Sequence, residues 1–295
     1  MQLLVSVSNE AEACAAREGG ADIIDAKDPH AGALGAVSLD TFRRIQSIGA
    51  PGGPVSAALG DADREDAIER MAHDYASAGA TFVKVGFAGI GDTSLIRSLL
   101  RAAVRGASDA DGHVVAVAYA DAMFSTLTLD EVLDAASSAG ATFVKVGFAG
   151  IEDASLVRSL LRAAVRGASD AHGHVVAVAY ADAMSTLTLD EVLDAASSAG
   201  ASGVLVDTAD KSGPGLRSLI DGDTLARWIL RAHDAGLTVA VAGKLVLDDL
   251  EWARDRGADI AGVRGAACQS GRASRVLAEK IRLLRAAAAP LVAPA

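Results

Sequence analysis

The sequence predicts an α/β fold, a TIM-type parallel (β/α) barrel enlarged from eight strands to ten. Short runs of β-branched residues alternate with amphipathic helical patterns along the 295 residues, which is typical of βα units and a parallel sheet. Residues 80–140 and 141–200 are near-identical copies of one βαβα unit. Without one copy the chain has eight βα units in 234 residues, close to the usual size of a (β/α)8 barrel.

The apolar runs predict ten strands in order. The first three runs are LLVSV, DIIDA and VSAAL. The middle four are two copies of FVKVGF and VVAVAY, and the last three are VLVD, VAVA and IAGV. The predicted strands are Leu3–Val7, Asp22–Ala26, Val55–Leu59, Phe82–Phe87, Val114–Tyr119, Phe143–Phe148, Val175–Tyr180, Val204–Asp207, Val239–Ala242 and Ile260–Val263.

Helices are predicted between the strands from their apolar stripes and their ends. Leu95, Leu99 and Ala103 recur at helical spacing and form one apolar face. Thr128 to Glu131, repeated as Thr188 to Glu191, has the pattern of a capping box that opens a helix. The phrase Ser-Ala-Gly-Ala, at Ser77, Ser138 and Ser198, precedes three successive strands and offers a seam for recombination.

The two copies differ at only four of their paired positions, and Phe124 has no partner, so the repeat is recent or engineered. The differences are Gly91/Glu152, Thr93/Ala154, Ile96/Val157 and Asp111/His172. An extruded copy would leave unpaired strand edges, whereas insertion into the sheet pairs every strand. We therefore expect one domain over residues 1–295, with a closed ten-stranded barrel. Its interior should be looser and wetter, and its stability lower, than in the eight-stranded parent.

Composition excludes several classes of function. The net charge of −11 without a basic run argues against nucleic acid or an anionic membrane as partner, and no apolar run approaches the length of a membrane span. Cys14 and Cys268 are too few for a disulfide framework, and no signal peptide is indicated, so a cytoplasmic location is expected. The sequence does not define the oligomeric state, and a homo-oligomer is one of the alternatives.

The lysines are the strongest chemical signal. Of 27 basic residues only six are lysine, and five of these fall within or just after predicted strands. The C-terminal ends of strands build the active site of such a barrel, and a desolvated lysine can lose its proton and act as nucleophile or base. We favour a catalytic role for Lys27 and Lys84. For Lys244, binding of a phosphate or a neighbouring carboxylate is at least as well supported as catalysis. The six are Lys27, Lys84, Lys145, Lys211, Lys244 and Lys280.

Aspartates accompany these lysines. Asp25 and Lys27 share one strand face, so an inward Lys84 near Asp25 or Asp121 is a candidate site. Asp121 is repeated as Asp182, and Asp207 ends a strand just before Lys211. The structural alternative for each aspartate is an N-cap of the next helix, an even choice for Asp121 and a weaker one for Asp25.

Glycine-rich loops after the last two strands predict a phosphate site. Barrels often bind phosphate there through loop amides, and Lys244 and Arg264 can add charge. Gly86 to Gly91 lacks the Gly-Lys-Ser/Thr of a P-loop. Neither the cysteines nor the histidines have metal-ligand spacing, so no metal and no cofactor are expected, and His113 and His174 are interpreted as structural. The predicted phosphate-binding residues are Gly243, Lys244, Gly262, Arg264, Gly265 and Ala266.

Seven motifs in order resemble the (5-formylfuran-3-yl)methyl phosphate synthases of methanofuran biosynthesis. They are LLVSV, GGADIIDAKDP, VSAALGD, FVKVGF, VAVAYAD, VLVDTADK and GVRGAAC, and the resemblance runs from Met1 to about Leu284 apart from the extra copy.

The resemblance implies a metal-independent lyase that condenses two molecules of glyceraldehyde 3-phosphate into a phosphorylated furan aldehyde, with loss of phosphate and water. It implies Lys27 as the Schiff-base lysine, Lys84 or Lys145 as the proton-transfer residue, and Lys211 with Asp25 as the rest of the site. Two alternatives stay open: another aldolase or isomerase acting on sugar phosphates, and an inactive scaffold with a duplicated unit.

Overall fold

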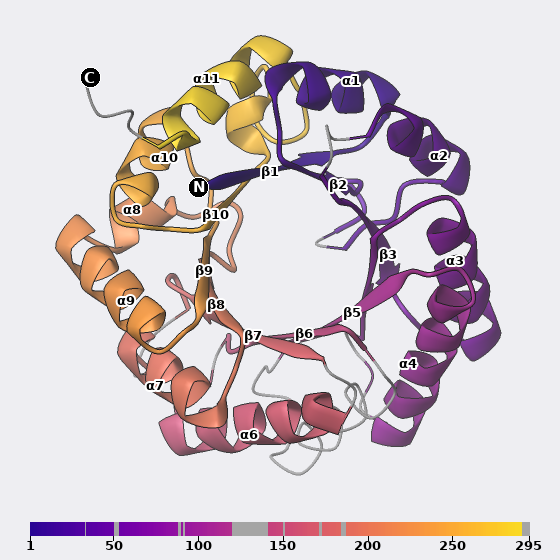
Figure 1. Cartoon of the computed structure of the whole chain (residues 1–295), viewed down its shortest axis with the longest axis horizontal. Coiled ribbons are helices and arrows are strands. Elements are labelled where there is room, and N and C mark those ends of the chain that lie inside the picture. Colours follow the sequence, from indigo (N-terminus) through magenta and orange to yellow (C-terminus); the bar gives the residue numbers. More distant parts are fainter. Residues whose placement is uncertain are drawn as a thin grey trace.

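The protein is a closed barrel of ten parallel strands surrounded by helices (Figure 1). The computed structural model describes residues 1–32, 34–49, 53–87, 90, 92–119, 141–149, 151–170, 173–183 and 187–290. The strands are β1 (Gln2–Val7), β2 (Ile23–Ala26), β3 (Val55–Asp61), β4 (Phe82–Gly86), β5 (His113–Tyr119), β6 (Phe143–Gly147), β7 (His174–Tyr180), β8 (Gly203–Asp207), β9 (Thr238–Val241) and β10 (Ile260–Val263). The predicted ten-stranded barrel is confirmed.

Both copies of the repeat are part of the sheet. Each strand pairs with the next one along the chain, and β10 closes the barrel against β1. The copies meet where β5 pairs with β6, with Val115 opposite Phe143 and Tyr119 opposite Gly147. Insertion therefore leaves neither copy with an open edge.

The strand register makes the stagger of the barrel equal to its number of strands. The register offsets between neighbouring strands, added once around the barrel from β1 back to β1, amount to ten residues. An eight-stranded barrel has a shear of about 8 and a strand tilt of about 36°. Because strand number and shear rise in proportion here, the tilt is kept, while the diameter grows by roughly a quarter.

This register places inward side chains of alternate strands at the same height, in layers of five rather than the usual four. We define two layers contributed by the even-numbered strands, the upper one lying nearer the C-terminal strand ends. The middle layer is Asp25, Lys84, Lys145, Leu205 and Gly262, and the upper layer is Lys27, Gly86, Gly147, Asp207 and Arg264.

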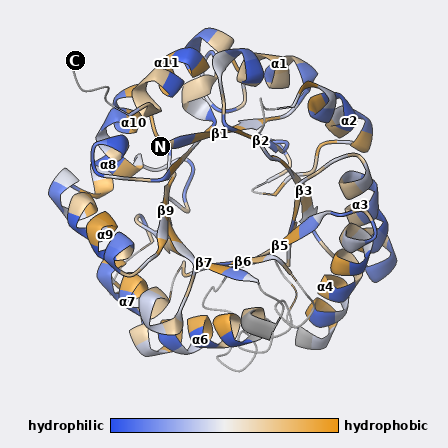
Figure 2. Ribbon diagram, viewed as in Figure 1, coloured by the Kyte–Doolittle hydropathy of each residue, from blue (hydrophilic) through white to orange (hydrophobic). Residues whose placement is uncertain are grey.

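The helices cover the outside of the barrel and display both hydrophobic and hydrophilic residues (Figure 2). The strand residues that face the helices are buried, and Val5, Val83 and Val144 are 0% exposed. Helices α3 and α4, joined by β4, pack closely together. The described helices are α1 (Glu10–Gly19), α2 (Leu39–Ile48), α3 (Glu65–Ser77), α4 (Thr93–Ser108), α6 (Ala154–Asp170), α7 (Leu189–Ala199), α8 (Leu216–Leu219), α9 (Gly222–Asp234), α10 (Leu247–Arg254), α11 (Ala278–Ala288) and the 3₁₀ turn η1 (Gly265–Ala267).

Some side chains on the inner face keep contact with water, while others, such as Asp25 and Val178, are buried. Leu4, Phe143 and Val176 are partly exposed although they sit within barrel strands. A looser and wetter interior than in an eight-stranded parent stays a prediction, which rests on the limited volume of valine and alanine side chains. The lower stability relative to the eight-stranded parent stays a prediction.

Helix α7 begins and ends as its sequence predicts. Thr188 accepts a hydrogen bond from the Glu191 backbone while the Glu191 side chain accepts one from the Thr188 backbone, which confirms the capping box of α7. Gly200, with φ of 80°, ends α7 inside the Ser-Ala-Gly-Ala phrase. The first capping box, Thr128 to Glu131, lies outside the described residues. Strand β3 runs to Asp61, two residues beyond the prediction, with an irregular register after Ala58.

The two histidines at the N-terminal strand ends, which are interpreted as structural, pack against phenylalanine rings. His113 packs against Phe82 and His174 stacks on Phe143, with ring centroids 5.7 and 5.0 Å apart. The two copies are joined by an edge contact between Phe82 and Phe143 at 5.5 Å. The duplication thus doubled this aromatic pair at the end of the barrel opposite the lysines.

Among the described residues, no helix is long and apolar enough to cross a membrane. In the same part of the chain, no three His, Cys, Asp or Glu side chains are grouped in a way that could hold a metal ion.

Candidate active site

Asp25 is the centre of a polar cluster on the inner face of the barrel. Strand β2 carries it inward, its side chain is 2% exposed, and it accepts hydrogen bonds from Ser56 at 2.6 Å and Ser6 at 3.4 Å. Lys84 forms an ion pair with Asp25 from β4, and Lys27 Nζ lies 3.7 Å from the same carboxylate. The predicted meeting of these three residues is confirmed.

The lysines keep Asp25 ionised. Burial alone would raise the pKa of Asp25, but the charges of Lys84 and Lys27, with hydrogen bonds from Lys84 and Ser56, outweigh it. The pKa of this carboxyl therefore lies well below its usual range, and Asp25 is a fixed negative charge between two amines.

Lys84 and Lys27 differ in how far they are withdrawn from water. The Lys84 side chain is 17% exposed, and that of Lys27 is 26% exposed. Burial lowers the pKa of Lys84, the charge of Asp25 raises it, and the charge of Lys27 lowers it, with a net lowering. Lys84 is thus placed to exchange a proton, and Lys27 is the more accessible amine.

Lys145 occupies the matching position in the second copy but has a different environment. In the middle layer its neighbours are Lys84 on one side and Leu205 on the other, and among the described residues no carboxylate lies within ion-pair distance of it. Burial, followed by the charge of Lys84, lowers the pKa of Lys145 to about 8. The two FVKVG lysines, identical in local sequence, are therefore electrostatically different.

A second polar group lies at the end of β8. Lys211 Nζ is 3.1 Å from Asp207 Oδ1 and also donates to the carbonyl of Thr208. Asp182 accepts hydrogen bonds from the backbone N–H groups of Ala209 and Asp210, each at 2.7 Å. Asp182 therefore fixes the loop that carries Lys211, while its counterpart in the first copy, Asp121, lies outside the described residues.

The predicted phosphate loops follow β9 and β10. Gly243 and Lys244 both have positive φ, 104° and 55°, which turns the chain sharply after β9. The exposed Lys244 side chain reaches back to the carbonyls of Gly213 and Ser212. Gly265 and Ala266 form the η1 turn after β10. No described contact tests phosphate binding here, and it stays a prediction.

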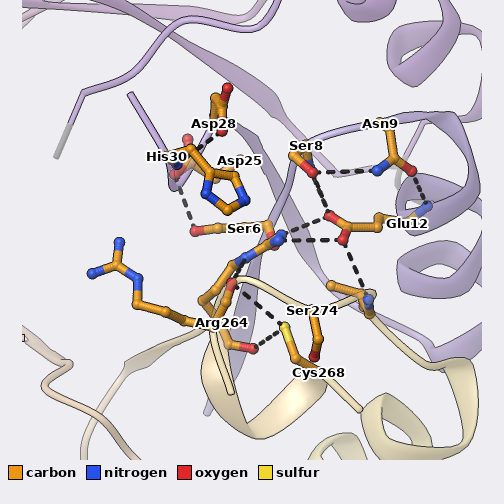
Figure 3. A network of polar contacts seen from close by, with 12 residues as sticks. Ser6, Ser8, Asn9, Glu12, Asp25, Asp28, His30, Arg264, Cys268 and Ser274 are labelled. Carbon is orange, nitrogen blue, oxygen red and sulfur yellow. Dashed lines mark hydrogen bonds and ion pairs between the residues drawn. The ribbon is translucent and has the colours of Figure 1, made fainter. Parts of the chain in front are cut away.

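Arg264 has its charge engaged inside the protein (Figure 3). Its guanidinium donates to both carboxylate oxygens of Glu12, at 2.6 and 3.2 Å, and to the carbonyls of Ser6 and Arg272, each at 2.9 Å. The Arg264 and Glu12 side chains are only 9% and 4% exposed. This pair ties β10 to β1 and α1, so a phosphate near this loop would depend on backbone amides unless the pair opened.

The identical substitution in the two copies should change stability in opposite directions. Lys145→Met removes a penalised charge, so the free energy of unfolding should rise at pH 7. Lys84→Met leaves Lys27 as the remaining cation beside the buried Asp25, so this variant should have a lower free energy of unfolding. Urea denaturation of both variants measures the two signs, and lower stability of Lys145→Met at pH 7 contradicts the prediction.

The pH dependence of this effect has a defined sign. Between pH 8 and the ordinary lysine value of 10.5, the unfolded chain holds a proton on residue 145 that the folded protein has lost. The stability of the unmodified protein therefore rises with pH relative to Lys145→Met across this window. The advantage of the variant should shrink between pH 7 and pH 10.

Comparison with known proteins gives consistent matches. The model of the 4-HFC-P synthase family matches residues 3–137 and 124–285, two segments that overlap near the junction of the copies. The (5-formylfuran-3-yl)methyl phosphate synthase of Methanopyrus kandleri is 31% identical over 93% of this chain and 92% of its own length. The enzyme of the same name from Methanothermobacter thermautotrophicus is 29% identical over 97% and 98%. A solved structure, phosphoribosyl anthranilate isomerase from Thermotoga maritima, is 13% identical, with 98% of both chains covered and a TM-score of 0.48.

Proposed function

The chain belongs to the 4-HFC-P synthase family, and from this premise we propose that it condenses two molecules of glyceraldehyde 3-phosphate to (5-formylfuran-3-yl)methyl phosphate. The reaction releases one phosphate and two molecules of water. The observation that carries the proposal is the cluster in which one buried carboxylate, Asp25, holds two lysine amines on the inner face of the barrel.

Lys27 is proposed as the Schiff-base residue. Its neutral amine adds to the aldehyde carbon of one triose, and loss of water gives an iminium ion. Its greater exposure within the pair supports access for a substrate, and the negative charge of Asp25 at 3.7 Å stabilises the positive iminium nitrogen.

Lys84 is proposed as the proton-transfer residue. Removal of a proton from the carbon next to the iminium gives an enamine, whose carbon then attacks the aldehyde of the second triose. The lowered pKa of Lys84 supports this role, because a lysine with its ordinary pKa holds its proton too firmly at neutral pH. Asp25 would position both amines, and Ser56 and Ser6 would position Asp25.

Two phosphates need two anchors. Lys211, 40% exposed and paired with Asp207, is proposed to serve one of them. The loops at Gly243 to Lys244 and at Gly262 to Ala266 are proposed to serve the other through their amides and the Lys244 amine.

Trapping tests the Schiff base. Borohydride added to protein and glyceraldehyde 3-phosphate should reduce an iminium to a stable adduct on Lys27, while the near-ultraviolet absorbance of a furan aldehyde reports turnover. Lys27→Arg is the matched control, since it keeps the charge next to Asp25 but cannot form an imine. Absence of an adduct on Lys27, whether or not another residue is modified, removes Lys27 from this role.

The same assay separates the alternatives. Another sugar-phosphate aldolase or isomerase would give an adduct or turnover without the furan absorbance. An inactive scaffold would give neither.

A further inference from the structure

We propose that Lys145 is a second carbonyl-reactive site, an amine on the inner face of the barrel that forms imines with short aldehydes independently of Lys27. The proposal goes beyond the synthase reaction, which needs only one FVKVG lysine. It rests on the position of Lys145 in the sheet and on what surrounds it.

The register decides which lysine reaches the carboxylate. In the middle layer Asp25 lies between Gly262 and Lys84, whereas Lys145 lies between Lys84 and Leu205. In an eight-stranded layer without the extra copy, a single lysine would have Asp25 on one side and Leu205 on the other. After the duplication Lys84 is the neighbour of Asp25 in this layer, and Lys145 is the neighbour of Leu205.

Burial is the main effect that favours the neutral form of Lys145. Among the described groups that act on it, Lys84 and Lys27 disfavour a proton, while Asp207 and Asp25 favour one but lie beyond ion-pair distance. The Tyr180 ring from β7 lies over Gly147, two residues further along β6. Desolvation, with no carboxylate of the described residues within ion-pair distance, favours the neutral and nucleophilic form of this lysine.

Lys145 is also accessible from the inside of the barrel. Lys145 and its paired neighbour Val176 are partly exposed, as is Phe143 on the same strand face. A small, uncharged aldehyde can therefore reach the amine. The amine adds to the carbonyl carbon, water leaves, and an imine forms.

Competitive labelling of the unmodified protein tests the proposal. Glycolaldehyde, which carries no phosphate, is supplied with cyanoborohydride, whose hydride reduces each imine to a secondary amine. Trypsin does not cut at the modified lysine, so the labelled fragment also contains Gly91 or Glu152 and identifies its copy. At pH 7 we expect Lys145 to be labelled about tenfold faster than Lys84, because the ion pair with Asp25 opposes deprotonation of Lys84 and no described carboxylate pairs with Lys145 in this way.

Two variants sharpen the result. Asp25→Asn should release Lys84 and bring its labelling toward that of Lys145, with circular dichroism used to confirm that this variant is folded. Lys145→Arg should leave the Glu152 fragment unlabelled. Labelling of Lys84 at or above the rate of Lys145 in the unmodified protein, or labelling of Lys145 no faster than that of Lys280 on α11, overturns the proposal. Neither outcome bears on Lys27, which is tested separately with the phosphorylated triose.

Discussion

Lys84→Ala abolishes furan formation, with a loss of at least about 100-fold, whereas Lys145→Ala slows it by less than about threefold. We expect this asymmetry because Lys84 shares Asp25 with the proposed Schiff-base residue Lys27, while Lys145 makes no such contact. Proton transfer needs hydrogen-bond reach to the bound substrate, and a misplacement of about 1 Å can cost about 100-fold in rate.

The two lysines are each other's control in this experiment. Their local sequences are identical, so the same substitution removes the same atoms from two places in one barrel. Product formation is compared at matched concentrations of folded protein, since the two variants differ in expected stability. A dead Lys145→Ala beside an active Lys84→Ala would place the working site around the second copy.

Arg264→Met lowers the free energy of unfolding by about 3–5 kcal/mol, the usual cost of removing one partner of a buried ion pair. Glu12 would remain buried, and among the described residues its carboxylate would keep as donors the N–H of Ser8, the hydroxyl of Ser8 and the N–H of Val276. Three uncharged donors do not replace a guanidinium that donates to both carboxylate oxygens.

Arg105→Met is the matched control for this measurement. Arg105 pairs with Glu69 at 2.7 Å, but their side chains are 53% and 40% exposed, so the loss should stay below about 1 kcal/mol. Urea denaturation gives both values. Similar losses in the two variants would mean that the Arg264–Glu12 pair does not hold the first and last strands together.

Much of the fold was predictable because each strand carries its own local signal. Alternating side-chain direction also predicted that Asp25 and Lys84 face inward. The FVKVG motif alone does not say which lysine contacts Asp25, since both copies have it. Chain order does, because Lys84 lies two strands from Asp25 and Lys145 lies four strands away.

Other parts of the site left weak signals or none. Ser56 was missed although it pairs with Asp25 in the sheet and shares its inward direction. The Arg264–Glu12 pair joins residues 252 positions apart. It depends on barrel closure, so no local pattern announces it, and the sequence suggested a phosphate contact for Arg264 instead.

The equality of strand number and stagger makes this architecture extensible. On β5, Phe82 of the first copy is paired with His113, and Phe143 of the second copy is paired with Val115, two residues further along. The added unit therefore contributes two strands and two residues of stagger together. Each further unit of this kind would preserve the inclination of every existing strand and change only the circumference. The backbone therefore sets no early limit on such growth. The limit comes from the amount of side-chain bulk available to span a hole that widens with every unit.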